Sequence, residues 1–409
     1  MESRIARAGN AGPKVRSDCE IILELKDRGG IQIELDSKVK SLYGESIRNL
    51  VNEILSFYGI RHASVILNDS GALPFVIAAR AEAAIKQLKK TDLEYLPDFL
   101  TNNSYTVKRD RFRFARLYLP GNTPSLMINA GLHGADSIIL DLEDSVAPDR
   151  KDEARIVVRN ALRQVDFFGA ERMVRINQGE RGQKDIRAIL PHNVHLILIP
   201  KCESEGQVRN IDQEIQAISR SLNLKSQVYL MPIIESAQGV ENAYSIATSS
   251  KNIVAMAIGL EDYTADLGVR RTKEGKESFY ARTRLVVASK AAGIQPIDSV
   301  FSDVADMEGL QSNVRESKSL GFEGMGCIHP RQVKVIRKGY APDESEIEKS
   351  KQIVLAFRKA REEGLGVVAL GSRMIDPPVV ERAGRIIDLA LSLGLLQSGW
   401  EGSTDLQEE

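Results

Sequence analysis

The sequence predicts an α/β protein whose main part is a (β/α)8 TIM barrel with a C-terminal helical lid, preceded by a small α+β domain. From Arg113 onward, short apolar runs rich in β-branched residues alternate with helix-length segments, as in successive parallel βαβ units. The runs number eight, which is the strand count of this barrel. No glycine-rich dinucleotide turn follows any run, which disfavours an open doubly wound sheet, the alternative architecture.

The composition is that of an ordinary globular protein. With 409 residues the chain is long enough for two or three domains, since single cores stop growing at about 250 to 300 residues. A formal net charge of -1 gives no general attraction to nucleic acid or to an anionic membrane, and no apolar run reaches the roughly 20 residues of a membrane span. We therefore expect neither partner. Cys19, Cys202 and Cys327 are widely spaced, which predicts reduced thiols and a cytoplasmic location.

A separate domain is predicted over residues 1–97. The segment 98–112 is polar and has no apolar periodicity, so it is predicted to be a linker. Within the domain, alternating apolar residues predict strands, with the first two on either side of a short Gly-rich turn, and apolar positions spaced three and four apart predict helices. The expected strands are Cys19–Lys26, Gly30–Asp36 and Ala63–Leu67, and the expected helices surround Ile47–Leu55 and cover Pro74–Lys89.

The barrel is predicted over residues 113–340 and the helical lid over residues 341–409. The eight expected strands are Leu117–Pro120, Ser137–Leu142, Met173–Asn177, Leu196–Pro200, Val228–Glu235, Val254–Leu260, Ile297–Phe301 and Gly324–Ile328. The lid is expected to contain two helices, Glu344–Glu363 and Val379–Leu395, separated by a Gly-rich segment.

Acidic residues gather where the barrel strands end. Catalytic groups of such barrels lie at the C-terminal ends of the strands. The second strand ends in Asp141–Asp144, the fifth in Glu235 and the sixth in Asp262. A few carboxylate oxygens with room for water suit Mg²⁺, and no Cys/His cluster suits zinc. Glu235 and Asp262 are therefore the predicted metal ligands, although each acid alone could instead cap a helix or form a structural ion pair.

Two further residues carry alternatives. Arg175 ends the third strand, where it is either a buried partner of Asp144 or a bidentate clamp for a substrate carboxylate. Asp376 precedes Pro377 and Pro378, a spacing that by itself is typical of a helix N-cap followed by proline at the first helical position.

The stretch Ala135–Val146 resembles the second-strand motif of the citrate lyase β subunit, in the HpcH/HpaI aldolase/citrate lyase superfamily that also holds malyl-CoA and citramalyl-CoA lyases. Further matches follow in the family's order from about Arg113 to about Leu396. They are Leu119–Asn122, Val174–Asn177, Ile199–Lys201, Ile234–Gly239, Gly259–Tyr263, Ile328–Gln332 and Gly371–Asp376.

The first domain resembles the acyl carrier (γ) subunit of citrate lyase, through Gly44–Arg48, Asp69–Leu73 and Ala79–Ala83. The chain thus resembles a γ–β fusion. That family carries a phosphoribosyl-dephospho-CoA arm on the serine of a Gly-x-x-x-Ser-x-Asp context. Here strict alignment places Arg16 at that position, and Ser17 takes the role if one residue is missing. A plain turn serine is the alternative.

The resemblance implies a lyase that cleaves a citryl thioester, on carrier protein or CoA, into oxaloacetate and an acetyl thioester. Glu235 and Asp262 would hold Mg²⁺, with Glu235 also contacting substrate, and Arg175 would pair with a substrate carboxylate. Asp376 matches an acid–base residue that the superfamily supplies from the lid of a neighbouring subunit. Glu143 and Asp144 would orient Arg175 and bound water. A Schiff base on Lys201 is not needed by this chemistry.

The resemblance also implies partners, namely a citrate lyase α (acyltransferase) subunit and further copies of this chain in a trimer-based homo-oligomer. Two other functions stay open at this point. The chain could be a stand-alone malyl-CoA or citramalyl-CoA lyase, or a related thioester-hydrolysing condensing enzyme, with a vestigial carrier domain. It could also be a scaffold without catalytic activity, although the joint presence of Arg175, Glu235, Asp262 and Asp376 argues against that.

Overall fold

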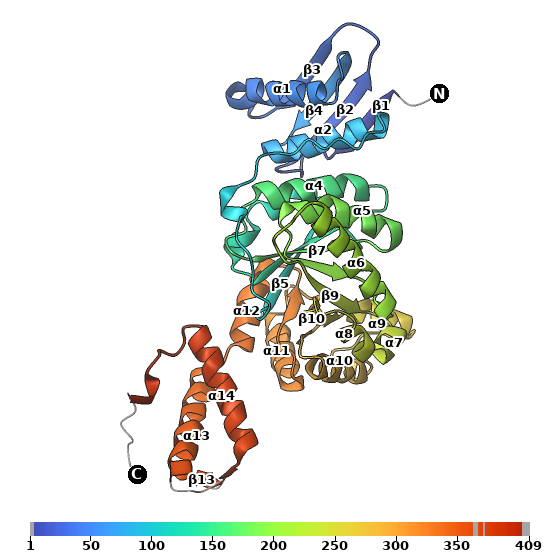
Figure 1. The fold of residues 1–409 in the computed structure, drawn as a ribbon. Helices are drawn as coiled ribbons and strands as arrows, with labels where there is room; N and C mark the ends of the chain where they lie inside the picture. Colours follow the sequence, from blue (N-terminus) through green and yellow to red (C-terminus); the bar gives the residue numbers. More distant parts are fainter. Residues whose placement is uncertain (1–3, 363–366, 371–372, 403–409) are drawn as a thin grey trace. The chain divides into compact units, whose positions relative to one another are not determined.

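A computed structural model describes residues 4–362, 367–370 and 373–402 (Figure 1). The chain divides into two compact units, residues 1–333 and 334–409. The first unit holds both the small N-terminal domain and the barrel, and the second holds the C-terminal helices. No helix of the described residues is long and apolar enough to cross a membrane.

The N-terminal domain contains a four-stranded sheet in the order β1-β2-β4-β3. Its strands are β1 (Ile5–Gly9), β2 (Cys19–Leu25), β3 (Ile31–Ser37) and β4 (Ala63–Asp69). As expected, β2 and β3 are consecutive strands separated by a short turn, but they do not pair with each other. β4 lies between them, antiparallel to β2 and parallel to β3, because its alternate residues are buried and suit a central strand. β1 was not predicted.

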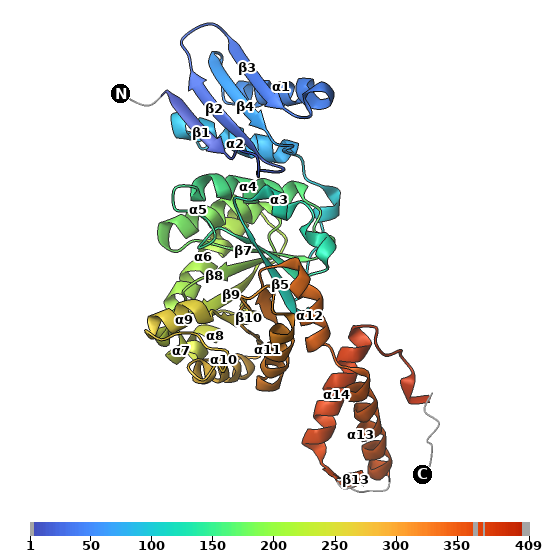
Figure 2. The same cartoon turned by 180° about the vertical axis from the view of Figure 1, so that it is seen from behind.

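Two helices complete this domain, α1 (Lys40–Phe57) and α2 (Pro74–Leu88). α1 packs on β3, and α2 packs on β1 and β2. α1 has an apolar stripe, whereas α2 is buried without a break from Phe75 to Ile85. Both views of the fold show why: α2 lies between the small sheet and α4 (Lys151–Gln164) of the barrel (Figures 1 and 2).

Eight parallel strands form the barrel, in the order β11-β10-β9-β8-β7-β6-β5-β12. They are β5 (Ala115–Pro120), β6 (Ser137–Asp141), β7 (Glu171–Arg175), β8 (Leu196–Ile199), β9 (Tyr229–Ile234), β10 (Ala255–Ile258), β11 (Gln295–Ile297) and β12 (Met325–Cys327). A parallel bridge between Asp298 and Met325 joins the two edges, which nearly closes the barrel. The predicted fold class is confirmed. β11 begins earlier than expected, since Gln295 pairs with Ala255 of β10.

Helices surround the barrel and short helices follow several strands. They are α3 (Pro124–Met127), α5 (Gly179–Ile189), α6 (Glu205–Ser221), α7 (Ala237–Glu241), α8 (Ala243–Ala247), α9 (Leu260–Asp266), α10 (Phe279–Ala291) and α11 (Met307–Leu320). Inside, side chains such as Met173, Leu198, Met231 and Ile297 form one buried cluster that fills the barrel. The buried Arg116 of β5 lies against this cluster, where it donates to the sulfur of Met231.

α12 (Pro330–Tyr340) leads into the second unit, which is built from α13 (Glu344–Glu362) and α14 (Pro377–Ser392). These helices pack on each other, and β13 (Val368–Leu370) pairs antiparallel with β14 (Arg373–Ile375) between them in the chain. Both expected helices are present. Residues 364–366 of the predicted Gly-rich segment, and Gly371 and Ser372 of the motif before Asp376, lie outside the described residues. The role of this unit as a lid stays a prediction.

Candidate active site

A cavity of about 360 Å³ opens at the C-terminal ends of the barrel strands. Its wall comes from residues at or just beyond the ends of β5, β6, β7, β9, β10, β11 and β12. The predicted residues Arg175, Glu235 and Asp262 all line this single cavity. The structure therefore brings together three side chains that sequence reasoning selected from separate strands.

Glu235 follows β9 directly, and its side chain is buried beside β10. Its Oε2 accepts a hydrogen bond from the backbone N–H of Lys201 at 2.8 Å. A Cβ atom on Gly259 would lie only 2.5 Å from Oε1 of Glu235, so the carboxylate keeps this place only because residue 259 has no side chain. Burial raises the pKa of Glu235 to about 7, although the Lys201 N–H and the charge of Arg175 oppose the rise.

Asp262 lies in the first turn of α9, where it is partly buried and close enough to Glu235 to raise that residue's pKa further. The start of the helix is fixed by Ser299, whose hydroxyl accepts a hydrogen bond from the backbone N–H of Leu260 at 3.1 Å. The preceding Glu261 instead forms an ion pair with Arg271 at 2.8 Å. Of these two neighbouring acids, only Glu261 is paired with a cation among the described residues, so Asp262 remains available to bind a cation in the cavity.

Most carboxylates of the cavity already have a cation. Asp141 pairs with Arg175, Glu261 with Arg271, and Asp298 with Arg282. Among the described residues, no ion pair involves Glu235 or Asp262. Two neighbouring carboxylates without a cation, one of them buried, form a site that a divalent cation would neutralise.

This site offers few protein ligands. In the described part of the chain, no group of three or more His, Cys, Asp or Glu side chains is placed to hold a metal ion. Such a group is needed for zinc or for an all-protein calcium cage. Mg²⁺ is commonly bound through one or two carboxylates, with waters and substrate oxygens completing the octahedron. The residues present therefore fit Mg²⁺ and do not fit a closed structural metal site.

Arg175 has a different main partner from the one that sequence reasoning offered. Its Nε and Nη2 atoms donate to the two oxygens of Asp141, both at 2.7 Å, whereas Asp144 is 3.6 Å from Nη1 and Glu143 is 3.1 Å from it. Asp141 was missed as the partner, although it lies directly opposite Arg175 in the parallel register of β6 and β7. A substrate carboxylate would have to use the Nη edge of the guanidinium.

Lys201 is held away from nucleophilic chemistry. Its Nζ lies 3.2 Å from Glu143 and 3.3 Å from Asp144. Burial lowers the pKa of Lys201, but the two carboxylates outweigh it and raise the pKa above its usual value. The amine therefore stays protonated, which disfavours a Schiff base. Its backbone supports the site instead, since it adopts a positive φ of 48° and directs its N–H to Glu235.

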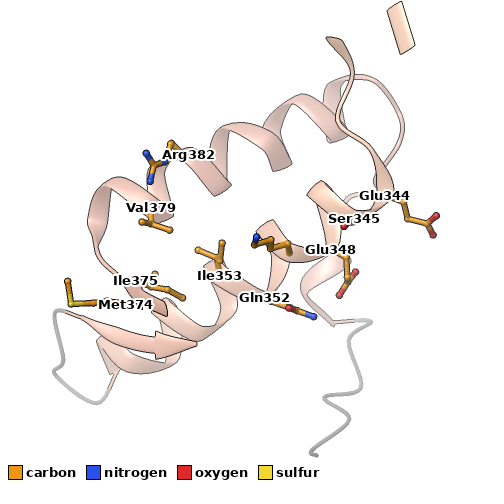
Figure 3. A pocket seen from close by; sticks show the side chains of 10 residues that line it. Glu344, Ser345, Glu348, Gln352, Ile353, Met374, Ile375, Val379 and Arg382 are labelled. Atoms are coloured by element: carbon orange, nitrogen blue, oxygen red, sulfur yellow. The ribbon is translucent and has the colours of Figure 1, made fainter. Parts of the chain in front are cut away.

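Asp376 lies in the second unit and caps α14. Its carboxylate accepts a hydrogen bond from the backbone N–H of Val379 at 3.3 Å, with proline at the first helical position. The capping arrangement expected from the spacing is thus present. Next to it, a cavity of about 1000 Å³ is lined by side chains from α13, β14 and the start of α14, among them Ile353, Ile375 and Val379 (Figure 3). Its acids, Glu344 and Glu348, both come from α13, whereas those of the barrel cavity come from several strands.

Ser17 lies in the loop between β1 and β2. Its backbone has a positive φ of 53° and donates a hydrogen bond to the carbonyl of Ser70 at 3.0 Å. The side chain is partly exposed, and no hydrogen bond among the described residues involves its hydroxyl. The neighbouring Asp18 is buried in an ion pair with Arg80. The three cysteines, Cys19, Cys202 and Cys327, are all buried and free.

The chain matches two protein families. The family model for HpcH/HpaI aldolase/citrate lyase matches residues 115–330, and the model for the malonate decarboxylase delta subunit (MdcD) matches residues 6–88. Citrate lyase subunit beta of Leuconostoc mesenteroides subsp. cremoris is 36% identical over 295 residues, which cover 71% of this chain and 98% of that protein. Mitochondrial citramalyl-CoA lyase of Mus musculus is 30% identical, covering 77% and 96%.

Solved structures agree with these matches. The structure of CitE from Mycobacterium tuberculosis in complex with magnesium, acetoacetate and coenzyme A has a TM-score of 0.59 and 30% identity, covering 69% of this chain and 99% of that one. CitE from the same organism in complex with magnesium and pyruvate has a TM-score of 0.52 and 28% identity, covering 68% and 99%. The chain belongs to the HpcH/HpaI aldolase/citrate lyase family, as a citrate lyase β-type carbon–carbon lyase with an acyl-carrier-type domain ahead of its barrel.

Proposed function

We propose that this chain cleaves a citryl thioester into oxaloacetate and an acetyl thioester, and that the thioester is carried on an arm attached to Ser17 of its own first domain. The observation that carries the proposal is the joining, in one chain, of a carrier-type domain and a citrate lyase β-type barrel. A stand-alone CoA-thioester lyase has no use for the first of these. We further propose an α acyltransferase partner, which would load the arm, and a trimer-based homo-oligomer.

We propose that Glu235 and Asp262 hold Mg²⁺, which when bound would polarise the hydroxyl and carboxylate oxygens of the substrate as a Lewis acid. Glu235 is fixed by the Lys201 N–H, and Asp262 by the Ser299-anchored start of α9. A Mg²⁺ ion held by two carboxylates keeps coordination positions for substrate oxygens. It would therefore suit a substrate with oxygens on neighbouring carbon atoms, such as a 2-hydroxy carboxylate.

Arg175 would bind a carboxylate of the oxaloacetate half through its Nη edge, since Asp141 occupies the Nε edge. A base must remove the proton of the tertiary hydroxyl as the C–C bond breaks. The bond electrons then form an enolate beside the thioester, which takes up a proton at carbon to give the acetyl thioester. We assign this acid–base function to Asp376 of a neighbouring subunit, with its direction set by Pro377 and Pro378.

The purified chain should be assayed for cleavage of citryl-CoA, malyl-CoA and citramalyl-CoA, with and without Mg²⁺. The proposal predicts oxaloacetate release from citryl-CoA that depends on the metal. Mass spectrometry should show an added mass of several hundred daltons on the first domain, and an α subunit should copurify from the native source. Cleavage of malyl-CoA or citramalyl-CoA alone, with an unmodified first domain, would instead identify a stand-alone lyase.

That second candidate is favoured by one observation, the 30% identity to mitochondrial citramalyl-CoA lyase across nearly the whole of that protein. A scaffold function makes a different prediction: activity of the assembled complex would survive Asp262→Ala undiminished.

A further inference from the structure

The N-terminal domain is joined to the barrel by two clusters of charged side chains, whose arginines are both buried. In the first, here called the rim cluster (Asp18, Arg80 and Glu153), Arg80 donates from Nε and Nη2 to the two oxygens of Asp18, at 2.9 and 2.8 Å. Nη1 of Arg80 lies 3.4 Å from Glu153 of α4. The Arg80 side chain is 0% exposed and the two acids are 4% and 6% exposed.

The second, here called the helix cluster (Glu82, Glu94 and Arg159), lies further along the same two helices. Arg159 of α4 donates from Nη1 and Nη2 to the two oxygens of Glu82 of α2, at 2.9 and 2.8 Å. Glu94 pairs with the same guanidinium at 3.0 Å. Asn160 adds a hydrogen bond from its amide to the carbonyl of Phe75 at 3.1 Å. One bidentate pair, Arg159 with Glu82, and the single contact between Arg80 and Glu153 thus join α2 to α4 at two points along their length.

The contact between α2 and α4 has the character of a permanent interface. Releasing the domain would expose the side of α2 that packs on α4, in a helix that is buried from Phe75 to Ile85. Carrier domains that visit distant sites need surfaces that are stable in water when released. Here the side of α2 that packs on α4 and the Arg159–Glu82 pair stabilise the docked state only, so the domain stays on the barrel.

The rim cluster also fixes the loop that holds Ser17. Nη2 of Arg80, which binds Asp18, donates to the carbonyl of Asn122 as well, at 3.1 Å. Asn122 lies in the loop after β5, two residues beyond Pro120, which lines the barrel cavity. At the other end of the loop, Arg150 donates to the carbonyl of Gly9 at 2.8 Å, and Glu153 accepts from the Gly9 N–H at 3.1 Å. Both ends of the Ser17 loop are thus attached to the rim from which substrate enters.

From this geometry we propose that the carrier acts in cis: the domain remains docked on the barrel of its own chain, and only an arm on Ser17 moves, entering the cavity of that same chain. The inference rests on the proposed function, because it requires an acylated arm. It goes further by naming the barrel that each arm serves. Arg80 and Arg159 are positioning residues in this account, since they hold the attachment loop at the rim and touch no substrate.

Two variants separate delivery in cis from delivery between chains. Ser17→Gly removes the hydroxyl that would carry the arm, and glycine tolerates the positive φ of 53° at this position. Asp262→Asn leaves the arm intact but removes a proposed metal ligand. The two variants are co-expressed in equal amounts with the α partner, and oxaloacetate release from citrate is measured in the purified complex. Each variant and the wild-type chain are measured alone in the same way.

Delivery in cis predicts that the mixture is no more active than the two variants alone, because no single chain has both an arm and an intact cavity. Restoration to a quarter or more of wild-type activity, as a rough threshold for random mixing, would overturn the inference. Cleavage of added citryl-CoA by the Ser17→Gly chain shows that its barrel is folded, and the arm mass on the Asp262→Asn chain shows that its carrier is loaded. A wild-type complex that releases no oxaloacetate would contradict the proposed function itself, whereas a wild-type chain without an arm would overturn the carrier role and this inference together.

Discussion

The docking interface and the barrel cavity both contain arginines and carboxylates, but the two regions differ in how completely these charges are paired. In both places an arginine forms a bidentate pair with an aspartate, Arg80 with Asp18 at the interface and Arg175 with Asp141 in the cavity. At the interface each arginine is paired with acids, and Arg80, Arg159, Asp18, Glu82 and Glu153 are buried. In the cavity the pairing leaves two further acids, Glu235 and Asp262, without a cation among the described residues.

Matched and unmatched charges thus serve different purposes in this chain. A buried ion pair holds two elements in register when every charge is matched, and removal of one member leaves an uncompensated charge. A surplus of one sign at the mouth of a barrel has no structural value and favours binding of an ion or a charged ligand.

The largest effect on the rate of cleavage is expected from removing one of the two unpaired acids of the cavity. Asp262→Ala should lower cleavage of citryl-CoA by ~1000-fold, because a bound metal contributes several kcal/mol to the stabilisation of the reacting oxygens. The thermal midpoint should stay the same or rise, since no ion pair is broken. Steady-state kinetics and a thermal melt measure both. Glu274→Gln, a change to an exposed acid on the segment after α9, is the control and should alter neither quantity.

Breaking the helix cluster should give the converse result. Arg159→Met leaves Glu82 buried without its main partner and should destabilise the first unit by about 3–5 kcal/mol. Cleavage of free citryl-CoA by the still folded enzyme should change little. Denaturant titration followed by fluorescence measures the stability. The double variant Arg159→Met with Glu82→Leu removes both charges and should recover most of the loss, and a double variant as unstable as the single one would show that the pair is not what holds α2.

A smaller effect is expected at Gly259. Gly259→Ala would place a methyl group 2.5 Å from Oε1 of Glu235, so the carboxylate must move. Mg²⁺ affinity should fall by about 10- to 100-fold, as it does when the positioning of a metal ligand is disturbed. Isothermal titration calorimetry measures this directly. Gly206→Ala, at an exposed position of α6 with open space around it, is the matched control. Equal affinities for the two variants would contradict the proposed role of Glu235.

The smallest effect concerns pH. Burial raises the pKa of Glu235 to about 7 in the metal-free protein, so the side chain must lose a proton before it can bind a cation. Mg²⁺ affinity should therefore weaken as pH falls through 7 and approach a tenfold loss for each further pH unit. Calorimetry at pH 8, 7 and 6 measures the change. Asp262→Asn would bind weakly at every pH, and an affinity of the wild type that does not vary with pH would exclude Glu235 as a ligand.

The barrel and the acids of its cavity were predictable because both follow from local order in the sequence. Strand and helix lengths repeat along the chain, and the position after each strand fixes which side chains reach the cavity. What sequence reasoning missed are pairings over long distances. Asp141 as the partner of Arg175 depends on the register of two strands, and Arg80 with Asp18 joins residues 62 positions apart.

The docking of the first domain also escaped prediction. The segment 98–112 was predicted as a linker, and residues 101–103 within it form a short 3-10 helix. Nevertheless Asn103 is fully buried and donates to the carbonyls of Leu162 and Val165 of the barrel. The sequence did contain one sign: between Phe75 and Ile85, α2 is apolar except for Arg80 and Glu82, and two charges in such a stretch need partners.

The proposed function depends on Glu235 and Asp262 together holding a divalent cation in the barrel cavity. A crystal soaked in Mn²⁺, used in place of Mg²⁺ because of its anomalous signal, tests this most directly. The account predicts a single strong anomalous peak between the two carboxylates, which is lost in Asp262→Asn. A map with no peak in the cavity at a saturating concentration, or with a peak bound to other residues, would contradict it.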